Sequence, residues 1–215
     1  MSHAHEEVDL ATMYTQETWD ARYAESERVW SGNPNPRLVE QVADLTPGRA
    51  LDVGCGEGAD VVWLAQQGWT ATGVDVSEVA LMKAAAHAED AGVEDKVAWE
   101  RLDLVGGVEV PGDQDLVSVH FFHPPPALFD ELHQRIGAAV RPGGHLLVVG
   151  HHPHDVTTGV RRPHGPDLLF TPERVVAALD PAEWEVLVAE TPTREQTMPD
   201  GPVTVTDSVV LARRR

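Results

Sequence analysis

Three glycines within eight residues constrain this chain more than any other feature. Residues 51–58, LDVGCGEG, place Gly54, Gly56 and Gly58 after a short apolar run, and an amphipathic segment follows at 59–67. Closely spaced glycines allow a tight turn with bare backbone, so a ligand can lie against the turn and the start of the next helix. The pattern predicts a strand, a glycine-rich turn and a helix, as at the start of a nucleotide-binding α/β sheet.

The same alternation continues along the chain to residue 150. Strands are predicted at 50–53, 71–75, 97–101, 115–120 and 146–150, and helices at 59–67, 78–91 and 128–140. Strands that alternate with helices favour right-handed crossovers and a parallel sheet with helices on both faces.

The last third of the chain has a different pattern. A predicted helix at 172–179 precedes alternating apolar runs at 184–189 and 203–212, which a polar stretch at 191–202 separates. Two such runs are typical of an antiparallel pair added to the edge of a sheet. The predicted fold class is therefore α/β: a Rossmann-like, mostly parallel sheet with an antiparallel C-terminal strand pair.

Charge and composition exclude several classes of protein. The chain has 16 Lys and Arg against 35 Asp and Glu, a net charge of −19, which repels nucleic-acid phosphates. Its single cysteine, Cys55, excludes an intramolecular disulfide. No apolar run approaches the ~20 residues of a membrane span, and the first residues do not read as a signal peptide. We expect a cytoplasmic monomer or homodimer that acts on a small molecule, with no nucleic-acid or membrane partner.

Three acidic residues accompany the predicted strand ends. Asp52 lies two residues before the first glycine of the turn, Asp75 ends the second strand and Asp103 follows the third. The glycine spacing differs from the dinucleotide fingerprint, and a carboxylate at 52 disfavours a pyrophosphate. An acid at the end of the second strand can accept the ribose hydroxyls of a nucleoside. Together these residues predict a positively charged nucleoside, for which S-adenosylmethionine is the fitting ligand.

The chain resembles the class I S-adenosylmethionine-dependent methyltransferases over residues 49–150. The resemblance rests on residues 51–58, 73–77 (GVDVS), 101–104 (RLDL) and 141–144 (RPGG). Residues 19–23, 29–34 and 169–213 are similar, more loosely, to the small methyltransferases of the tellurite-resistance and thiopurine types.

This resemblance implies a seven-stranded sheet whose last strand is antiparallel, with S-adenosylhomocysteine as the product. It implies one methyltransferase domain over 1–215, made of an N-terminal cap (1–48), a cofactor-binding core (49–150) and a substrate loop with the C-terminal strands (151–215). The glycines would lie under the methionine moiety, Asp75 on the ribose and Asp103 near the adenine. The predicted cofactor-binding residues are Trp30, Asp52, Gly54, Cys55, Gly56, Gly58, Asp75, Val76, Asp103, Leu104 and His120.

Histidines gather where the predicted fourth and fifth strands end, the edge at which parallel sheets bind ligands. We predict that His120 and His123 are catalytic, as a base or orienting group for the nucleophile, because a neutral imidazole titrates near working pH. Two alternatives stay open. The histidines could be hydrogen-bonded loop residues without a catalytic role, or His151, His154 and a strand-four histidine, with Asp155 nearby, could bind a metal. We assign no metal.

Aromatic and basic residues complete the predicted site. Tyr14, Trp19, Tyr23 and Trp30 could form a lid over the cofactor or pack the N-terminal segment on the sheet. Arg161 and Arg162 could bind an anionic group or remain solvated. The predicted substrate residues are Tyr14, Tyr23, His151, His154 and Arg162.

The predicted function is transfer of a methyl group from S-adenosylmethionine to a sulfur, nitrogen, oxygen or chalcogen atom of a small molecule. The alternative is a non-catalytic protein that senses S-adenosylmethionine or a metal through the histidines. A short dehydrogenase would need a Tyr-x-x-x-Lys pair, and neither Tyr14 nor Tyr23 has a lysine at that spacing.

Overall fold

The computed structural model describes residues 12–158, 160, 165–198 and 201–215. Its strands are β1 (Arg49–Val53), β2 (Thr70–Asp75), β3 (Val97–Arg101), β4 (Gln114–His120), β5 (Val140–His151), β6 (Trp184–Glu190), β7 (Thr193–Met198) and β8 (Gly201–Arg214). Its helices are α1 (Gln16–Ala24), α2 (Pro36–Val42), α3 (Ala59–Gln66), α4 (Glu78–Asp90), α5 (Phe129–Ala138), α6 (His154–Thr157) and α7 (Pro172–Ala178). Short 3-10 turns lie at Glu94–Lys96, Pro126–Leu128 and Pro166–Leu168.

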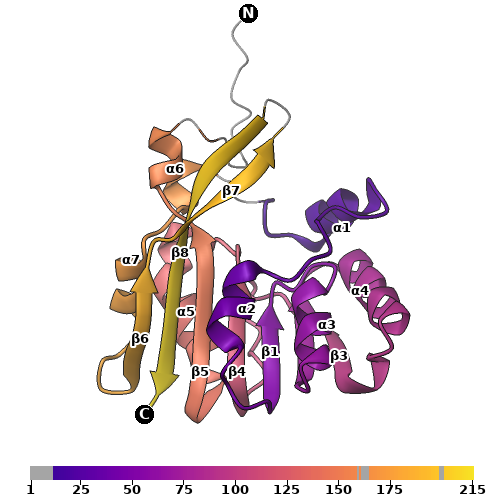
Figure 1. The fold of residues 1–215 in the computed structure, drawn as a ribbon, viewed down its shortest axis with the longest axis horizontal. Coiled ribbons are helices and arrows are strands. Elements are labelled where there is room, and N and C mark those ends of the chain that lie inside the picture. Colours follow the sequence, from indigo (N-terminus) through magenta and orange to yellow (C-terminus); the bar gives the residue numbers. More distant parts are fainter. Residues whose placement is uncertain (1–11, 159, 161–164, 199–200) are drawn as a thin grey trace, which may run out of the picture.

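The strands form one sheet in the order β3-β2-β1-β4-β5-β8-β6, and β7 pairs with β8 beside this path (Figure 1). Neighbouring strands from β3 to β5 are parallel, whereas β8 is antiparallel to β5, β6 and β7. The predicted fold class is confirmed. The order reverses between β1 and β4, where open α/β sheets form a crevice outside the carboxyl ends of their strands.

Helices cover both faces of this sheet. Leu38 of α2 and Leu64 of α3 pack with Leu116 of β4 on one face. Leu132 of α5 and Val175 of α7 pack on the other face. Successive strand residues point to opposite faces, so a strand between two helical layers is apolar at nearly every position. This explains the continuous apolar runs of the central strands.

The structure differs from the prediction at residues 191–202, which were expected to be a polar loop in a seven-stranded sheet. Residues 193–198 instead form β7, which makes the sheet eight-stranded and pairs from Thr193↔Thr206 to Met198↔Gly201. The sequence of β7, TREQTM, lacks alternation of apolar and polar residues, the signal from which strands are predicted. Figure 1 shows β7 and the first half of β8 projecting beyond the carboxyl ends of the central strands.

The N-terminal segment is attached to the same end of the sheet. Asp20 of α1 accepts hydrogen bonds from Ser77 Oγ (2.6 Å) and from the backbone N–H of Val79 (3.2 Å). One carboxylate thereby links α1 to the first turn of α4, where a negative charge is favourable. Within the described ranges, no helix is both long and apolar enough to cross a membrane.

Candidate functional site

A cavity of about 650 Å³ lies outside the carboxyl ends of β1, β2 and β4. The glycine-rich turn after β1, the ends of β2 and β4, and the loop after β3 contribute to its lining. The N-terminal residues 13–36 and two residues of β7 contribute further walls. Its volume falls within the roughly 300–1,000 Å³ that is usual for sites that bind small molecules.

The glycine-rich turn has the backbone geometry that its sequence predicts. Gly54, Gly56 and Gly58 have φ values of 71°, 54° and 80°, in the left-handed region that favours glycine. A Cβ atom on Gly56 would lie 2.7 Å from the Tyr23 hydroxyl oxygen. At Gly58 it would lie 2.6 Å from the Trp99 ring. Gly58 does not line the cavity, so its contribution is to let α3 pack closely on β3, not to contact a cofactor.

Acidic side chains line the cavity around this turn. Asp75, 9% exposed, accepts hydrogen bonds from the backbone N–H groups of Gly56 and Ser77, both at 2.9 Å. Burial raises the pKa of Asp75, although these hydrogen bonds act in the opposite direction. Asp103 accepts a 2.7 Å hydrogen bond from the N–H of Gly106, which shapes the loop after β3. The other predicted cofactor residues that line the cavity are Trp30, Asp52, Gly54, Cys55, Val76, Leu104 and His120.

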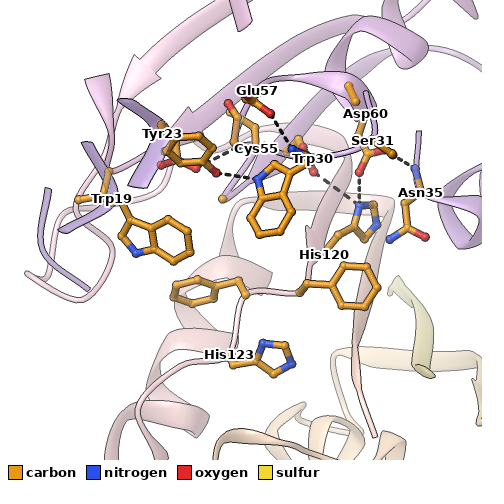
Figure 2. A pocket seen from close by; sticks show the side chains of 18 of the residues that line it. Trp19, Tyr23, Trp30, Ser31, Asn35, Cys55, Glu57, Asp60, His120 and His123 are labelled. Carbon is orange, nitrogen blue, oxygen red and sulfur yellow. Dashed lines mark hydrogen bonds and ion pairs between the residues drawn. The ribbon is translucent and has the colours of Figure 1, made fainter. Parts of the chain in front are cut away.

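Glu57, inside the turn, holds the N-terminal segment over the cavity. Its carboxylate accepts hydrogen bonds from the N–H groups of Val29 and Trp30 and pairs with Lys83 Nζ at 3.2 Å. Burial acts to raise the pKa of Glu57, but these hydrogen bonds and Lys83 lower it overall. The Trp30 indole in turn donates to the Tyr23 hydroxyl at 3.1 Å, as Figure 2 shows. The sequence analysis missed Glu57 and Lys83, because the partners lie 26 residues apart in the chain.

His120, at the end of β4, is held by two carboxylates. Its Nδ1 lies 2.7 Å from Asp60 Oδ2 and 3.9 Å from Asp52 Oδ1. Asp60 also accepts from the N–H of Asn35 at 2.6 Å, and Asp52 accepts from Ser118 Oγ at 2.6 Å. Figure 2 shows His120 beside Trp30, with Asp60 at its Nδ1 edge.

The environment of this imidazole favours its use in proton transfer. Burial acts to lower the pKa of His120, but Asp60 and Asp52 outweigh it, so the pKa is raised. Burial and the charge of Asp60 raise the pKa of Asp52 as well. Nε2 of His120 is buried and has no hydrogen-bond partner among the residues that the structure describes. Asp60 was not predicted; its position on the first turn of α3 carries no local signal for a histidine 60 residues away.

The other histidines have different surroundings. His123 is 2% exposed, its Nε2 accepts from the backbone N–H of His151 at 3.1 Å, and the two rings stack 5.0 Å apart. Both line the cavity, whereas His154 is an exposed residue of α6 and does not. The metal alternative built on His151 and His154 is not supported. In the described part of the chain, the group with metal-ligand spacing is Asp52, Asp60 and His120, within 4.8 Å.

The remaining predicted substrate residues divide into three cases. Tyr14 lines the cavity and donates its hydroxyl to the carbonyl of His123 at 2.7 Å. Tyr23 also lines the cavity, and its hydroxyl reaches the glycine-rich turn, where the cofactor was predicted. Arg161 and Arg162 lie outside the described residues. The cavity has a cationic side chain that the sequence analysis did not consider, Arg194 of β7.

Several known proteins are similar to this chain in sequence. Residues 50–144 match the family model for a methyltransferase domain. The chain is 30% identical over 124 residues to the 2-heptyl-1-hydroxyquinolin-4(1H)-one methyltransferase of Mycobacteroides abscessus. The aligned region covers 56% of this chain and 54% of that protein. The chain thus spans about half the length of the curated relatives it matches.

Solved structures share the fold at low sequence identity. One of these structures was determined in work on the conversion of a disulfide bond into a thioacetal group during echinomycin biosynthesis. Its TM-score is 0.74 at 20% sequence identity, and the match covers 93% of this chain and 91% of that one. TehB from Haemophilus influenzae has a TM-score of 0.65 at 18% identity, over 84% of this chain and 62% of that one. These likenesses extend the fold beyond residues 50–144 to most of the chain.

Proposed function

We propose that this protein, which carries a methyltransferase domain of the class I S-adenosylmethionine-dependent type, transfers a methyl group from S-adenosylmethionine to a heteroatom of a small molecule. One observation carries the proposal: the glycine-rich turn, with Asp75 and Asp103, opens into a cavity that residues 13–36 cover. The methyltransferase family match over residues 50–144 supports it independently.

The residues of the cavity fit the cofactor. Without a Cβ atom, Gly56 accommodates the Tyr23 hydroxyl beside the turn, and Gly54, Gly56 and Tyr23 all line the cavity. Asp75 would accept the ribose hydroxyls, Asp103 would lie near the adenine, and the Trp30 ring would face a cationic sulfonium. When bound, the cofactor supplies a methyl group that is already activated for displacement. The protein's own residues therefore mainly align the acceptor and exclude water.

His120 is the base that we assign to this reaction. A carboxylate only accepts hydrogen bonds, so in neutral His120 the Nδ1–H donates to Asp60 and the lone pair lies on Nε2. His120 lines the cavity, and its Nε2, which has no hydrogen-bond partner among the described residues, would take the proton of an incoming oxygen, nitrogen or sulfur nucleophile. Asp60 is a positioning residue that fixes the tautomer, and His123 supports the cavity wall through His151.

The acceptor class that we propose is a small molecule. The cavity is the size of such a site, and the excess of acidic residues in the chain repels nucleic acids. The Mycobacteroides relative is named for a hydroxyquinolone, which is a small aromatic acceptor. A metal-sensing role is less well supported, because the potential ligand atoms already have partners: His120 Nδ1 bonds to Asp60, and Asp52 accepts from Ser118 Oγ.

Titration calorimetry with S-adenosylmethionine tests the cofactor part of this proposal. We expect wild-type binding, and about 10- to 100-fold weaker binding for Asp75→Ala, because a buried charged acceptor is lost. Asp44→Ala, at an exposed position outside the cavity, serves as the matched control. A methyl-transfer assay over thiols, phenols and amines then tests the reaction. Binding of a nucleoside diphosphate in preference to S-adenosylmethionine, or of zinc without methyl transfer, would contradict the proposal.

A further inference from the structure

The cavity has two chemically different ends. Carboxylates gather around the glycine-rich turn and the end of β4: Asp52, Glu57, Asp60, Asp75 and Asp103. Arg194 of β7 also lines the cavity, and it is the only lysine or arginine among the described lining residues. A cationic cofactor suits the acidic end of the cavity. The positive charge of Arg194 suits a different, anionic ligand group.

The fold positions Arg194 on the wall of the cavity. Side chains alternate along β7, so Arg194 and Gln196 are half-buried while Thr193 and Glu195 are exposed. The Nε atom of Arg194 donates to Oδ2 of Asp207 at 2.9 Å. Asp207 is 1% exposed and comes from the paired strand β8, so this bond anchors the side chain.

The anchor leaves the outer edge of the guanidinium available. Asp207 Oδ2 is shared with Arg37, whose Nη atoms bond to Glu40 and to the carbonyl of Thr193. By contrast, no described residue accepts a hydrogen bond from either Nη atom of Arg194. Arg194 thus presents a fork of N–H donors, the geometry that binds a carboxylate in two parallel hydrogen bonds.

The aromatic ring of Phe121 lies close to this guanidinium. The Cζ atom of Arg194 is 5.8 Å from the ring centroid of Phe121, the residue that follows His120 in the chain. The Phe121 ring lies 4.5 Å from the ring of His151, with an interplanar angle of 30°. Phe121 has a φ of 54°, uncommon for a bulky residue, and such strain is found where a site holds a side chain in a required direction.

We propose that Arg194 recognises the acceptor and that the acceptor is a planar small molecule that carries a carboxylate. Its ring lies along Phe121, its carboxylate pairs with Arg194, and its nucleophilic atom faces His120 Nε2. Methyl transfer forms the bond from that atom to the methyl carbon and breaks the methyl–sulfur bond, and His120 takes the proton; Arg194 exchanges none. This inference rests on the proposed function.

Matched pairs of probes test the inference through binding as well as turnover. Titration calorimetry compares 4-hydroxybenzoate with its neutral analogue 4-hydroxybenzamide, with and without S-adenosylhomocysteine. Methyl transfer is compared for 4-mercaptobenzoate and 4-mercaptobenzamide. The variants are Arg194→Gln and Arg194→Lys, and the control is Arg213→Gln, an exposed arginine that pairs with Glu185 beside the opposite end of β5. Thermal unfolding checks that each variant is folded.

We expect the wild type to bind the acid about tenfold or more tightly than the amide, since a charge-assisted pair is formed. Arg194→Gln should remove this preference for the acid and leave the affinity for S-adenosylhomocysteine unchanged. Arg194→Lys should keep part of the preference, and Arg213→Gln should match the wild type.

Three results would overturn the inference. These are a wild type that binds neither probe, a wild type without acid preference, and an Arg194→Gln variant that loses cofactor affinity while it keeps the preference. The last result would assign Arg194 to the cofactor's own carboxylate. Failure to bind S-adenosylhomocysteine at all counts instead against the proposed function, because the acid preference is also measured on the unliganded protein.

Discussion

At the scale of single residues, the chemistry of the cavity depends on how one imidazole is held. Asp60 fixes the ring of His120 through Nδ1, while Asn35 fixes Asp60 from the N-terminal segment. The same carboxylate therefore orients the base, raises its pKa and helps to attach the segment that covers the cavity. A single change at residue 60 tests these roles together.

Asp60→Asn should reduce methyl transfer strongly. An Asn carbonyl would still accept from Asn35, so its NH2 group would face His120 and favour the tautomer with hydrogen on Nε2, which cannot take a proton. We expect a loss of about 10²–10⁴-fold in kcat for acceptors that need a base. Thiolate acceptors, already deprotonated, should lose much less.

The pH profile gives a second readout of this pair. Because Asp60 and Asp52 raise the pKa of His120, the wild-type rate should fall as pH decreases through a pKa above the ordinary value of His. Loss of the Asp60 charge lowers that pKa, so the acid limb of the Asp60→Asn profile should move to lower pH. An unchanged limb together with a wild-type rate would contradict the assignment of His120.

At the scale of elements, the turn between β1 and α3 joins fold and function. Gly56, which has no Cβ, makes room for the Tyr23 hydroxyl, whereas Gly58, which precedes α3, makes room for the Trp99 ring of β3. The two positions share the left-handed backbone but differ in what a side chain would meet.

Gly58→Ala should destabilise the fold more than Gly92→Ala, a matched control at the end of α4. Both positions have a positive φ, which costs alanine about 1–2 kcal/mol, but a Cβ on Gly92 meets nothing within 4 Å. The contact with Trp99 should add about 1–3 kcal/mol for Gly58→Ala. Urea denaturation of the two variants measures this difference, and equal losses would show that the close packing at Gly58 is unimportant.

At the scale of the whole molecule, the cavity is assembled from parts of the chain that are remote in sequence. Residues 13–36, the strand ends of the core and β7 each supply a wall, and Glu57, Asp60 and Asp20 attach the N-terminal wall to the core. A ligand that fills the cavity would contact several of these parts and so stabilise the folded chain.

S-adenosylhomocysteine should therefore raise the melting temperature. At 100 times Kd a ligand adds about 2.7 kcal/mol, which for a chain of this size corresponds to about 5–10 °C. Differential scanning fluorimetry measures the shift, and Asp75→Ala, with its about 10- to 100-fold weaker binding, should reduce it to about half or less at the same ligand concentration. An equal shift in both proteins would place the ligand away from Asp75.

Local signals were enough to predict the strands and helices of the core, the glycine-rich turn and the acids at the strand ends. A strand's apolar run, a helical period and a glycine at a turn all act over a few residues, so they can be found in one sequence. The strand β7 could not be found in this way, because TREQTM has no apolar alternation and forms its strand by pairing with β8.

The side chains that define the cavity depend on partners far along the chain. Asp60 meets His120 across 60 residues, Lys83 meets Glu57 across 26, and Arg194 gains its anchor in Asp207 only when β7 pairs with β8. Hydrophobic periodicity and turn residues reflect the local preferences of the backbone, which neighbouring residues in the sequence determine. Which carboxylate lies beside which imidazole or guanidinium depends on strand order and on the packing of the N-terminal segment, which exist only once the chain has folded.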